Sequence, residues 1–193
     1  MKGGKATRVL HLLATAMVIA AAALLWQNLP TPDDVYGPFD VHAGVGQRAT
    51  GRGVTAQVDA VRIAPRIRGE RESAPVIDAL GAWVVIDGEA MTTLGDESLK
   101  SELILGPNTY RRTDRVNFLP ITGSLAPGIT VRGSWVFDVP VDLVAAGAQP
   151  MTLRLWVGDG RQDSRLVVDI PVDDPKVSRT DLVRLEPATQ VGT

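Results

Sequence analysis

Two patterns of apolar residues divide this chain. Residues 9–26, VLHLLATAMVIAAAALLW, are almost continuously apolar, and only His11 and Thr15 interrupt them. The run approaches the roughly 20 residues that a helix needs to cross the hydrocarbon core of a bilayer. After residue 43, apolar residues recur in short runs separated by Gly, Pro and Asp, which is typical of strands joined by turns. We therefore expect one membrane helix followed by a β-rich domain.

The residues that flank the apolar run predict its orientation. Three basic residues and no acid precede the run: Lys2, Lys5 and Arg8. Asp33 and Asp34 follow it. By the positive-inside rule, residues 1–8 are expected in the cytoplasm, and residues 9–26 form a transmembrane signal anchor in contact with membrane lipid. The C-terminal domain is then extracytoplasmic, at the cell membrane.

A cleaved signal peptide is the alternative interpretation of the same run. Residues 20–23 are four alanines, and small residues of this kind precede signal cleavage sites. Against cleavage, Leu24, Leu25 and Trp26 continue the apolar run beyond the alanines, and Trp26 suits an aromatic position at the outer membrane interface. We therefore expect an uncleaved anchor.

Beyond the run, the pattern predicts a stalk and then strands. Residues 27–42 are rich in Pro and Gly, which favours a semi-rigid stalk. Residues 54–63 alternate apolar and polar side chains, but the step of three from Val58 to Val61 breaks the period of two and predicts one β-bulge. Residues 83–86 are apolar without alternation, as in a central strand.

Later segments add turns and further strands. Leu103 and Leu105 alternate with polar residues before a turn at 106–108, and the sequence GDGRQD predicts the turn of a hairpin near the C-terminal end of the domain. The fold class expected is all-β, an immunoglobulin-like antiparallel β-sandwich over residues 43–173. Residues 174–193 are polar with weak periodicity, and we predict a C-terminal tail there.

Residues 125–140, LAPGITVRGSWVFDVP, carry the most regular pattern in the chain. Pro127 and Gly128 predict a type II-like turn, because Pro sets φ at the first central position and Gly supplies a positive φ at the second. The odd-numbered positions after the turn are mostly apolar, so Trp135 and Phe137 are expected to face the core. This segment is informative about fold and contributes little chemistry.

The same segment resembles a motif of bacterial telokin-like, immunoglobulin-like extracytoplasmic domains, a family largely of unknown function. The motif is Leu-x-Pro-Gly followed by Gly-x-hydrophobic-x-Phe-x-Val-Pro. Residues 54–63 and 83–86 occupy the places of the family's first and central strands, and the sequence LRLWV resembles its closing strand. The resemblance covers about residues 46–172. The chain departs from the family after the central strand, where VVIDGEAMTTLGD replaces an alternating strand that continues with Asn.

Composition narrows the function classes. The chain of 193 residues has 20 Lys and Arg and 22 Asp and Glu, mixed along its length, so there is no basic tract for nucleic acid. Cysteine is absent, which excludes disulfides, thiolate nucleophiles and cysteine-ligated zinc. We therefore expect no nucleic-acid partner.

Candidate catalytic groups are few. The histidines are His11, within the membrane segment, and His42, which is expected to be a solvated linker residue. Acids pair at Asp87 and Glu89, at Asp96 and Glu97, at Asp159 and Asp163, and at Asp173 and Asp174. Hydrolysis by carboxylates requires two acids held on opposite sides of a cleft. We expect these acids to lie in solvated turns instead, where they are not held in that way. GDGRQD lacks the spacing and the bidentate Glu of an EF-hand calcium loop.

The sequence thus predicts a protein that is not an enzyme, with no catalytic, cofactor-binding or metal residues. The leading hypothesis is a single-pass membrane-anchored β-sandwich module that acts in protein binding or scaffolding at the bacterial cell envelope, with an envelope or membrane protein as partner. The alternative is an accessory subunit of a membrane transport or secretion complex. A third hypothesis, from another class, is a carboxylate-based hydrolase.

Overall fold

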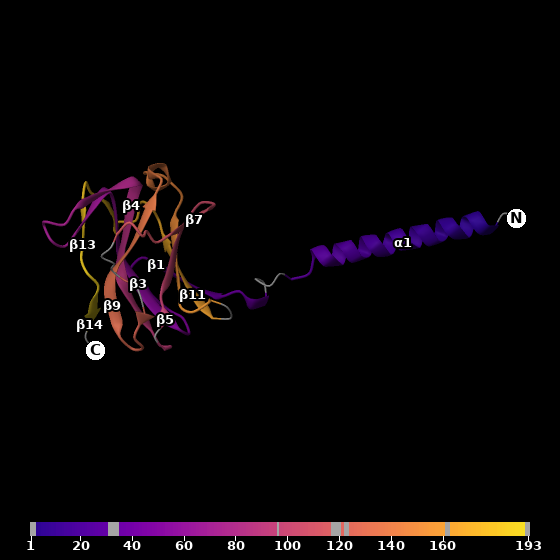
Figure 1. Cartoon of the computed structure of the whole chain (residues 1–193), viewed down its shortest axis with the longest axis horizontal. Helices are drawn as coiled ribbons and strands as arrows, with labels where there is room; N and C mark the ends of the chain where they lie inside the picture. The colour runs from indigo at the N-terminus through magenta and orange to yellow at the C-terminus, as the bar shows by residue number, and fades with distance from the viewer. Residues whose placement is uncertain are drawn as a thin grey trace. The chain divides into compact units, whose positions relative to one another are not determined.

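The computed structural model of the chain describes residues 3–30, 35–95, 97–116, 121, 124–160 and 163–191. The chain divides into two compact units, Met1–Gly37 and Pro38–Thr193. The first contains helix α1 (Gly3–Gln27), and the described part of the second is built almost entirely of strands (Figure 1).

Helix α1 has the properties expected of a membrane span. Its segment Leu10–Gln27 is long and apolar enough to cross a membrane, although a signal sequence near the N-terminus has the same properties. The hydroxyl of Thr15 donates a hydrogen bond of 2.9 Å to the carbonyl oxygen of His11, one turn earlier. One of the two polar side chains within the run is therefore satisfied inside the helix, as an apolar surrounding requires.

The second unit is a β-sandwich of two main sheets, which confirms the expected all-β fold class. The five-stranded sheet has the order β1 (Phe39–Gly44), β11 (Ser164–Ile170), β10 (Met151–Trp156), β6 (Lys100–Leu105) and β7 (Asn108–Arg111). The main path of the seven-stranded sheet is β12 (Val177–Arg179), β3 (Val54–Gly69), β4 (Val76–Thr92), β9 (Thr130–Val139) and β14 (Thr189–Val191). Strands β2 (Arg48–Thr50) and β13 (Val183–Leu185) also pair with β3.

Short elements complete the described part of the domain. Strands β5 (Glu97–Ser98) and β8 (Ser124–Leu125) form a two-stranded sheet, and a 3₁₀ helix, η1 (Val141–Val144), follows β9. Most pairings are antiparallel, but β1 pairs in parallel with β11, and β12 and β13 pair in parallel with β3. The parallel pairings thus involve the first and the last parts of the domain.

The core lies between the two main sheets. Side chains from alternate positions of β9 and β10 enter it, among them Trp135, Phe137 and Leu155, which are at most 1% exposed. This confirms the expected burial of Trp135 and Phe137. All four residues 83–86 are also buried, because β4 pairs with a strand on each side and has both faces covered. The prediction of a central strand is therefore confirmed.

Local features predicted from turn residues are also present. The β3–β4 register shifts between Val58 and Ala60, where the break in alternation predicts a bulge. Gly128 has a φ of 76°, and the N–H of Ile129 donates to the carbonyl of Ala126 at 3.2 Å, which closes a four-residue turn. Strands β10 and β11 pair as the predicted hairpin.

The predicted polar tail at residues 174–193 is wrong. Strands β12 and β13 pair with β3, and β14 pairs with β9 at the other side of the same sheet. The yellow C-terminal segment in Figure 1 carries β13 and β14 along one side of the sandwich. Val183 and Leu185 are buried against a second apolar cluster on the outer face of β3, β4 and β9, which includes Trp83. The alternation of apolar and polar residues in Val183–Leu185 is only three residues long. It is too short to predict a strand unless the apolar cluster that it packs against is known.

The predicted stalk also ends earlier than residue 42. Residues 39–42 belong to β1, because the backbone of this segment pairs with β11 from Phe39 onward. The guanidinium of Arg165 on β11 donates two hydrogen bonds to the carboxylate of Asp40, at 2.8 and 2.9 Å. This bidentate pair fastens the first strand of the domain to its neighbour.

Leu185→Ala is expected to destabilise the domain by about 2–4 kcal/mol, because it removes a fully buried side chain and leaves a cavity. Denaturation of the full chain in detergent measures this change. Arg184→Ala is the matched control, because Arg184 is exposed and only 3.7 Å from an exposed Glu72, so its effect stays below about 0.5 kcal/mol. Equal effects of the two substitutions would contradict the burial of this segment.

Asp40→Asn is expected to destabilise the domain at neutral pH and to have little effect in acid. Hydrogen bonds from Arg165 lower the pKa of Asp40 below its ordinary value. The stabilisation by this carboxylate is therefore present above the ordinary pKa of about 4 and is lost as the pH falls through the lowered value. Denaturation of both proteins across this range checks the prediction, and a difference that does not change with pH would contradict it.

Candidate partner-binding site at the bulge of β4

The candidate site is an interruption in the pairing of β3 with β4. Ala64 pairs with Trp83 and Arg66 pairs with Asp78, so Pro65 alone faces the four residues 79–82. Proline has no N–H and cannot continue a ladder of backbone hydrogen bonds. Residues 79–82 therefore form an enlarged bulge near the start of β4, which we call the β4 bulge.

Asp138 on β9 binds the backbone of the β4 bulge. Its carboxylate accepts hydrogen bonds from the N–H of Leu80, at 3.0 Å, and from the N–H of Gly81, at 3.2 Å. The Asp138 side chain is only 12% exposed. A carboxylate thus takes the place of the carbonyl acceptors that a regular ladder would offer to these N–H groups.

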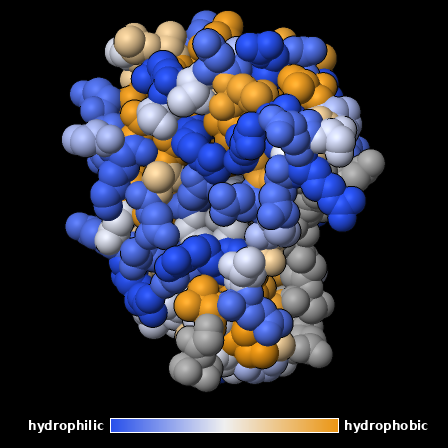
Figure 2. Space-filling model, turned by 90° about the vertical axis from the view of Figure 1, so that its left-hand side faces the viewer, coloured by the Kyte–Doolittle hydropathy of each residue, from blue (hydrophilic) through white to orange (hydrophobic). Residues whose placement is uncertain are grey.

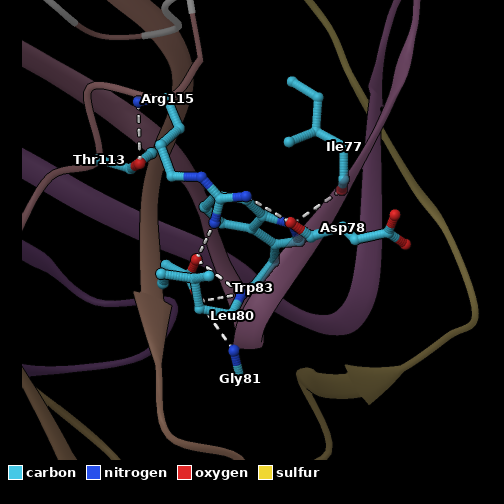
Figure 3. Close-up of polar contacts among 8 residues, drawn as sticks. Ile77, Asp78, Leu80, Gly81, Trp83, Thr113 and Arg115 are labelled. Carbon is cyan, nitrogen blue, oxygen red and sulfur yellow. Dashed lines mark hydrogen bonds and ion pairs between the residues drawn. The ribbon is translucent and has the colours of Figure 1, made fainter.

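Arg115 binds the same region from the segment that follows β7. Its guanidinium pairs with Asp138, donates a hydrogen bond of 2.8 Å to the carbonyl of Asp78, and lies over the indole of Trp83 with 5.1 Å between its central carbon and the ring centroid. The close-up shows this stack and the bulge around it (Figure 3). Trp83 Nε1 donates to the carbonyl of Ile77 at 3.0 Å. A cation–π contact and several side-chain hydrogen bonds therefore fix the bulge.

Gly81 is required by the close approach of two backbones. A Cβ atom at this position would lie 2.3 Å from the carbonyl oxygen of Val139. Any other residue would push β4 away from β9, and Asp138 would no longer reach the bulge.

The bulge presents an apolar side chain to solvent. Leu80 is 87% exposed although its own N–H is bound by Asp138. Ala82, which ends the bulge, pairs with Val139 near the end of β9. Val141 follows two residues later, so it lies at the same end of the β4–β9 pair as the bulge, and it is 62% exposed. An exposed leucine on a rigid backbone loses little conformational freedom on binding. We refer to Leu80 and Val141 as the bulge surface.

The structure contradicts the expectation that Asp87 and Glu89 lie in a turn. Both residues lie within β4, where their side chains point away from the core. Arg62 donates to Asp87 through Nε at 2.6 Å and through Nη2 at 2.7 Å, and the Ser134 hydroxyl donates to the same carboxylate at 2.7 Å. Asp87 is thus part of a bidentate ion pair.

Glu89 is held in the same manner. Arg48 on β2 donates to it at 2.6 Å, and Arg132 on β9 donates at 3.2 Å. The two carboxylates therefore link neighbouring strands of the seven-stranded sheet. Asp87 pairs with one arginine and Glu89 with two, which favours a structural role for both acids.

A hollow of about 530 Å³ lies beside these ion pairs, between the sheet and the C-terminal segment. Its lining includes Arg62, Asp87, Arg132, Glu186 and Pro187. Figure 2 shows the side of the molecule that carries β13 and β14; hydrophilic side chains cover most of it, and apolar groups gather toward its upper and lower ends. The bulge surface is separate from this hydrophilic hollow.

The other residues singled out in the sequence are dispersed. His42 lies in β1 instead of a linker, with its side chain 65% exposed and Nδ1 3.8 Å from Asp169. Asp163 and Asp174 accept backbone N–H groups in turns, as expected for turn residues. Asp96 lies outside the described residues, and within the described ranges no three His, Cys, Asp or Glu residues are grouped to hold a metal ion.

Comparison with known proteins yields one similar solved structure and no family. No protein-family model matches the chain, and no curated protein matches it. The crystal structure of an uncharacterized β-sandwich protein from Clostridium difficile 630 is similar, with 13% sequence identity and a TM-score of 0.44. The match covers 69% of this chain and 96% of that one. The resemblance to telokin-like domains stays a prediction.

Proposed function

We propose that this protein is a membrane-anchored, extracytoplasmic β-sandwich module that binds an envelope or membrane protein through the bulge surface. The observation that carries the proposal is the exposure of Leu80 on a backbone that Asp138 and Arg115 hold in place. An exposed leucine is common, but Leu80 stands on a backbone that a largely buried carboxylate and a cation–π stack hold in place, which supports its presentation to a partner.

The partner chemistry follows from the bulge surface itself. Two aliphatic side chains, Leu80 and Val141, are exposed at this end of the β4–β9 pair, and the Arg115 side chain, which binds the bulge, is 36% exposed. Such a surface fits an apolar socket rimmed by acidic groups on another protein. The acids Asp87 and Glu89 lie outside the bulge surface, and the arginines that engage both carboxylates favour a structural role for them.

Helix α1 supports the anchoring part of the proposal. The apolar segment Leu10–Gln27 has no Asp, Glu, Lys or Arg, and Lys5 and Arg8 precede it. This arrangement favours an orientation with the N-terminus in the cytoplasm. The domain would then work at the outer side of the membrane, tethered by residues 28–38.

Protease treatment of intact spheroplasts tests the anchoring. We expect carbonate washing to leave the full chain in the membrane, and external protease to remove the sandwich from intact spheroplasts. Intact mass of the purified chain distinguishes an anchor from a cleaved signal. A protected domain would contradict the orientation, and a soluble chain that lacks residues 1–23 would contradict the anchor.

Copurification in mild detergent tests the binding surface. We expect a stoichiometric membrane or envelope protein to copurify with the full chain and to be lost with Leu80→Asp. Leu94→Asp is the matched control, because Leu94 is 38% exposed beyond the opposite end of β4. Loss of the partner with both variants, or retention with both, would contradict a role for the bulge surface.

A further inference from the structure

We infer that the five-stranded sheet carries a second binding surface, a cationic groove for an acidic polysaccharide. A cavity of about 640 Å³ opens over the neighbouring strands β10, β6 and β7. The residues that define the groove are Lys100, Glu102, Arg111, Arg112 and Trp156. This inference goes beyond the proposed protein-binding role and concerns the other main sheet.

Strand register brings these side chains together. Trp156 on β10 pairs with Lys100 on β6, and Glu102 on β6 pairs with Arg111 on β7. The alternate residues Leu103 and Leu155 fill the core, so Lys100, Glu102 and Trp156 project from the opposite face of the sheet. The groove is thus a property of the sheet face and does not depend on one loop.

The groove has an excess of positive charge. Three cations line it against one acid, in a chain whose formal net charge is −2. Arg111 is 86% exposed, and its Nε lies 3.8 Å from Glu102. Lys100 and Arg112 form no ion pair with any residue that the structure describes. These two side chains are available to an anionic ligand.

Arg154 adds an unsatisfied donor beside the groove. It precedes Trp156 on the same face of β10 and pairs in register with Glu102. Its Nε is buried and has no hydrogen-bond partner among the described residues. The positive charge of Arg154 therefore lies next to the groove and adds to the charge of Lys100, Arg111 and Arg112.

Trp156 gives the groove its preference for a sugar ring. The indole is held along one edge by the hairpin turn, where a Cβ on Gly160 would lie 2.9 Å from Trp156 Cδ1. A fixed indole can stack against the apolar C–H face of a sugar ring while flanking Lys and Arg side chains bind its carboxylates. Single-stranded nucleic acids are bound by several stacked aromatics, whereas Trp156 is the one aromatic among the described residues that line this groove.

Titration of the full chain in detergent with polygalacturonate tests this inference. We expect binding that weakens as salt increases, because the attraction is electrostatic. Lys100→Glu combined with Arg112→Glu should weaken binding by about tenfold or more. Arg71→Glu combined with Arg52→Glu is the matched control, since both arginines are exposed and lie outside the groove, and it should leave the affinity within about twofold.

Trp156→Ala separates sugar recognition from simple charge attraction. It should weaken binding of polygalacturonate but leave any binding of inorganic polyphosphate unchanged, because polyphosphate has no ring to stack. Trp156→Phe should restore part of the loss, which shows that the variants fold.

Equal binding of both polymers to all variants, or tighter binding to anionic lipid vesicles than to polygalacturonate, would overturn the inference. Leu80→Asp, which removes the proposed protein-binding surface, should bind polygalacturonate as the parent chain does. A failure of the proposed protein-binding function can therefore be told apart from a failure of this inference.

Discussion

Trp135→Ala is expected to lower the free energy of unfolding by about 3–5 kcal/mol, the range for truncating a large aromatic side chain in a core. Trp135 is 1% exposed and lies on β9 between the sheets. Its ring packs beneath Gly88, where an added Cβ would approach Trp135 Cζ3 to 3.0 Å. The space left by alanine therefore lies under the centre of β4, where backbone pairing on both sides limits collapse.

Denaturation of the full chain in detergent, followed by circular dichroism, measures the effect of Trp135→Ala. Val141→Ala is the control, because Val141 is 62% exposed directly after the same strand and should change stability by less than about 0.5 kcal/mol. A loss below about 1 kcal/mol for Trp135→Ala would mean that the site tolerates truncation as a surface position does.

Asp138→Ala is expected to cost about 2–4 kcal/mol, because it leaves three donors without their acceptor. The N–H groups of Leu80 and Gly81 lose their bonds, and the guanidinium of Arg115 loses its carboxylate. Asp138→Asn keeps one acceptor oxygen of the same shape, so it should recover part of this loss.

Denaturation again provides the measurement for Asp138→Ala, with Asp169→Ala as the control, since the Asp169 side chain is 58% exposed. We also expect Asp138→Ala to weaken partner binding, because the bulge would no longer hold Leu80 outward. Stability within about 0.5 kcal/mol of the parent chain would show that the carboxylate does not hold the bulge.

The strands that could be predicted are those whose pattern is local. The alternation around residues 129–139 marks one face of β9, and the slip between Val58 and Val61 marks a bulge in β3. The Pro127-Gly128 turn is equally local, since it depends on the backbone preferences of two adjacent residues. Such features depend on residues that are close together in the sequence, so the residue pattern is sufficient to predict them.

The features that could not be predicted depend on pairing over long distances in sequence. Asp138 binds the N–H of a residue 58 positions earlier, and nothing near Asp138 in the sequence distinguishes it from the other acids of the chain. Pro65 indicates an interruption in strand pairing, because proline has no backbone N–H to donate to a neighbouring strand. The sequence does not show which residues lie opposite it. The strand at Val183 is hidden for the same reason, since its apolar partners lie on three other strands.

The acids of β4 illustrate a related difficulty. Asp87 and Glu89 flank a glycine, and the sequence D-G-E is typical of a turn. In the structure, Gly88 allows β4 to pass close to the backbone of β3, with an added Cβ only 2.2 Å from the carbonyl oxygen of Gln57. Glycine here serves close packing within a strand, and the acids on either side of it pair with arginines from neighbouring strands.

Photo-crosslinking in living cells tests the central claim most directly. A photoreactive amino acid at position 80 of the full chain should give one discrete adduct with an envelope or membrane protein, because Leu80 is expected to enter an apolar socket on its partner. The same residue at position 94, beyond the far end of β4, should not give that adduct. An adduct of equal yield from both positions, or none from position 80 in cells where the domain is exposed to external protease, would contradict the account.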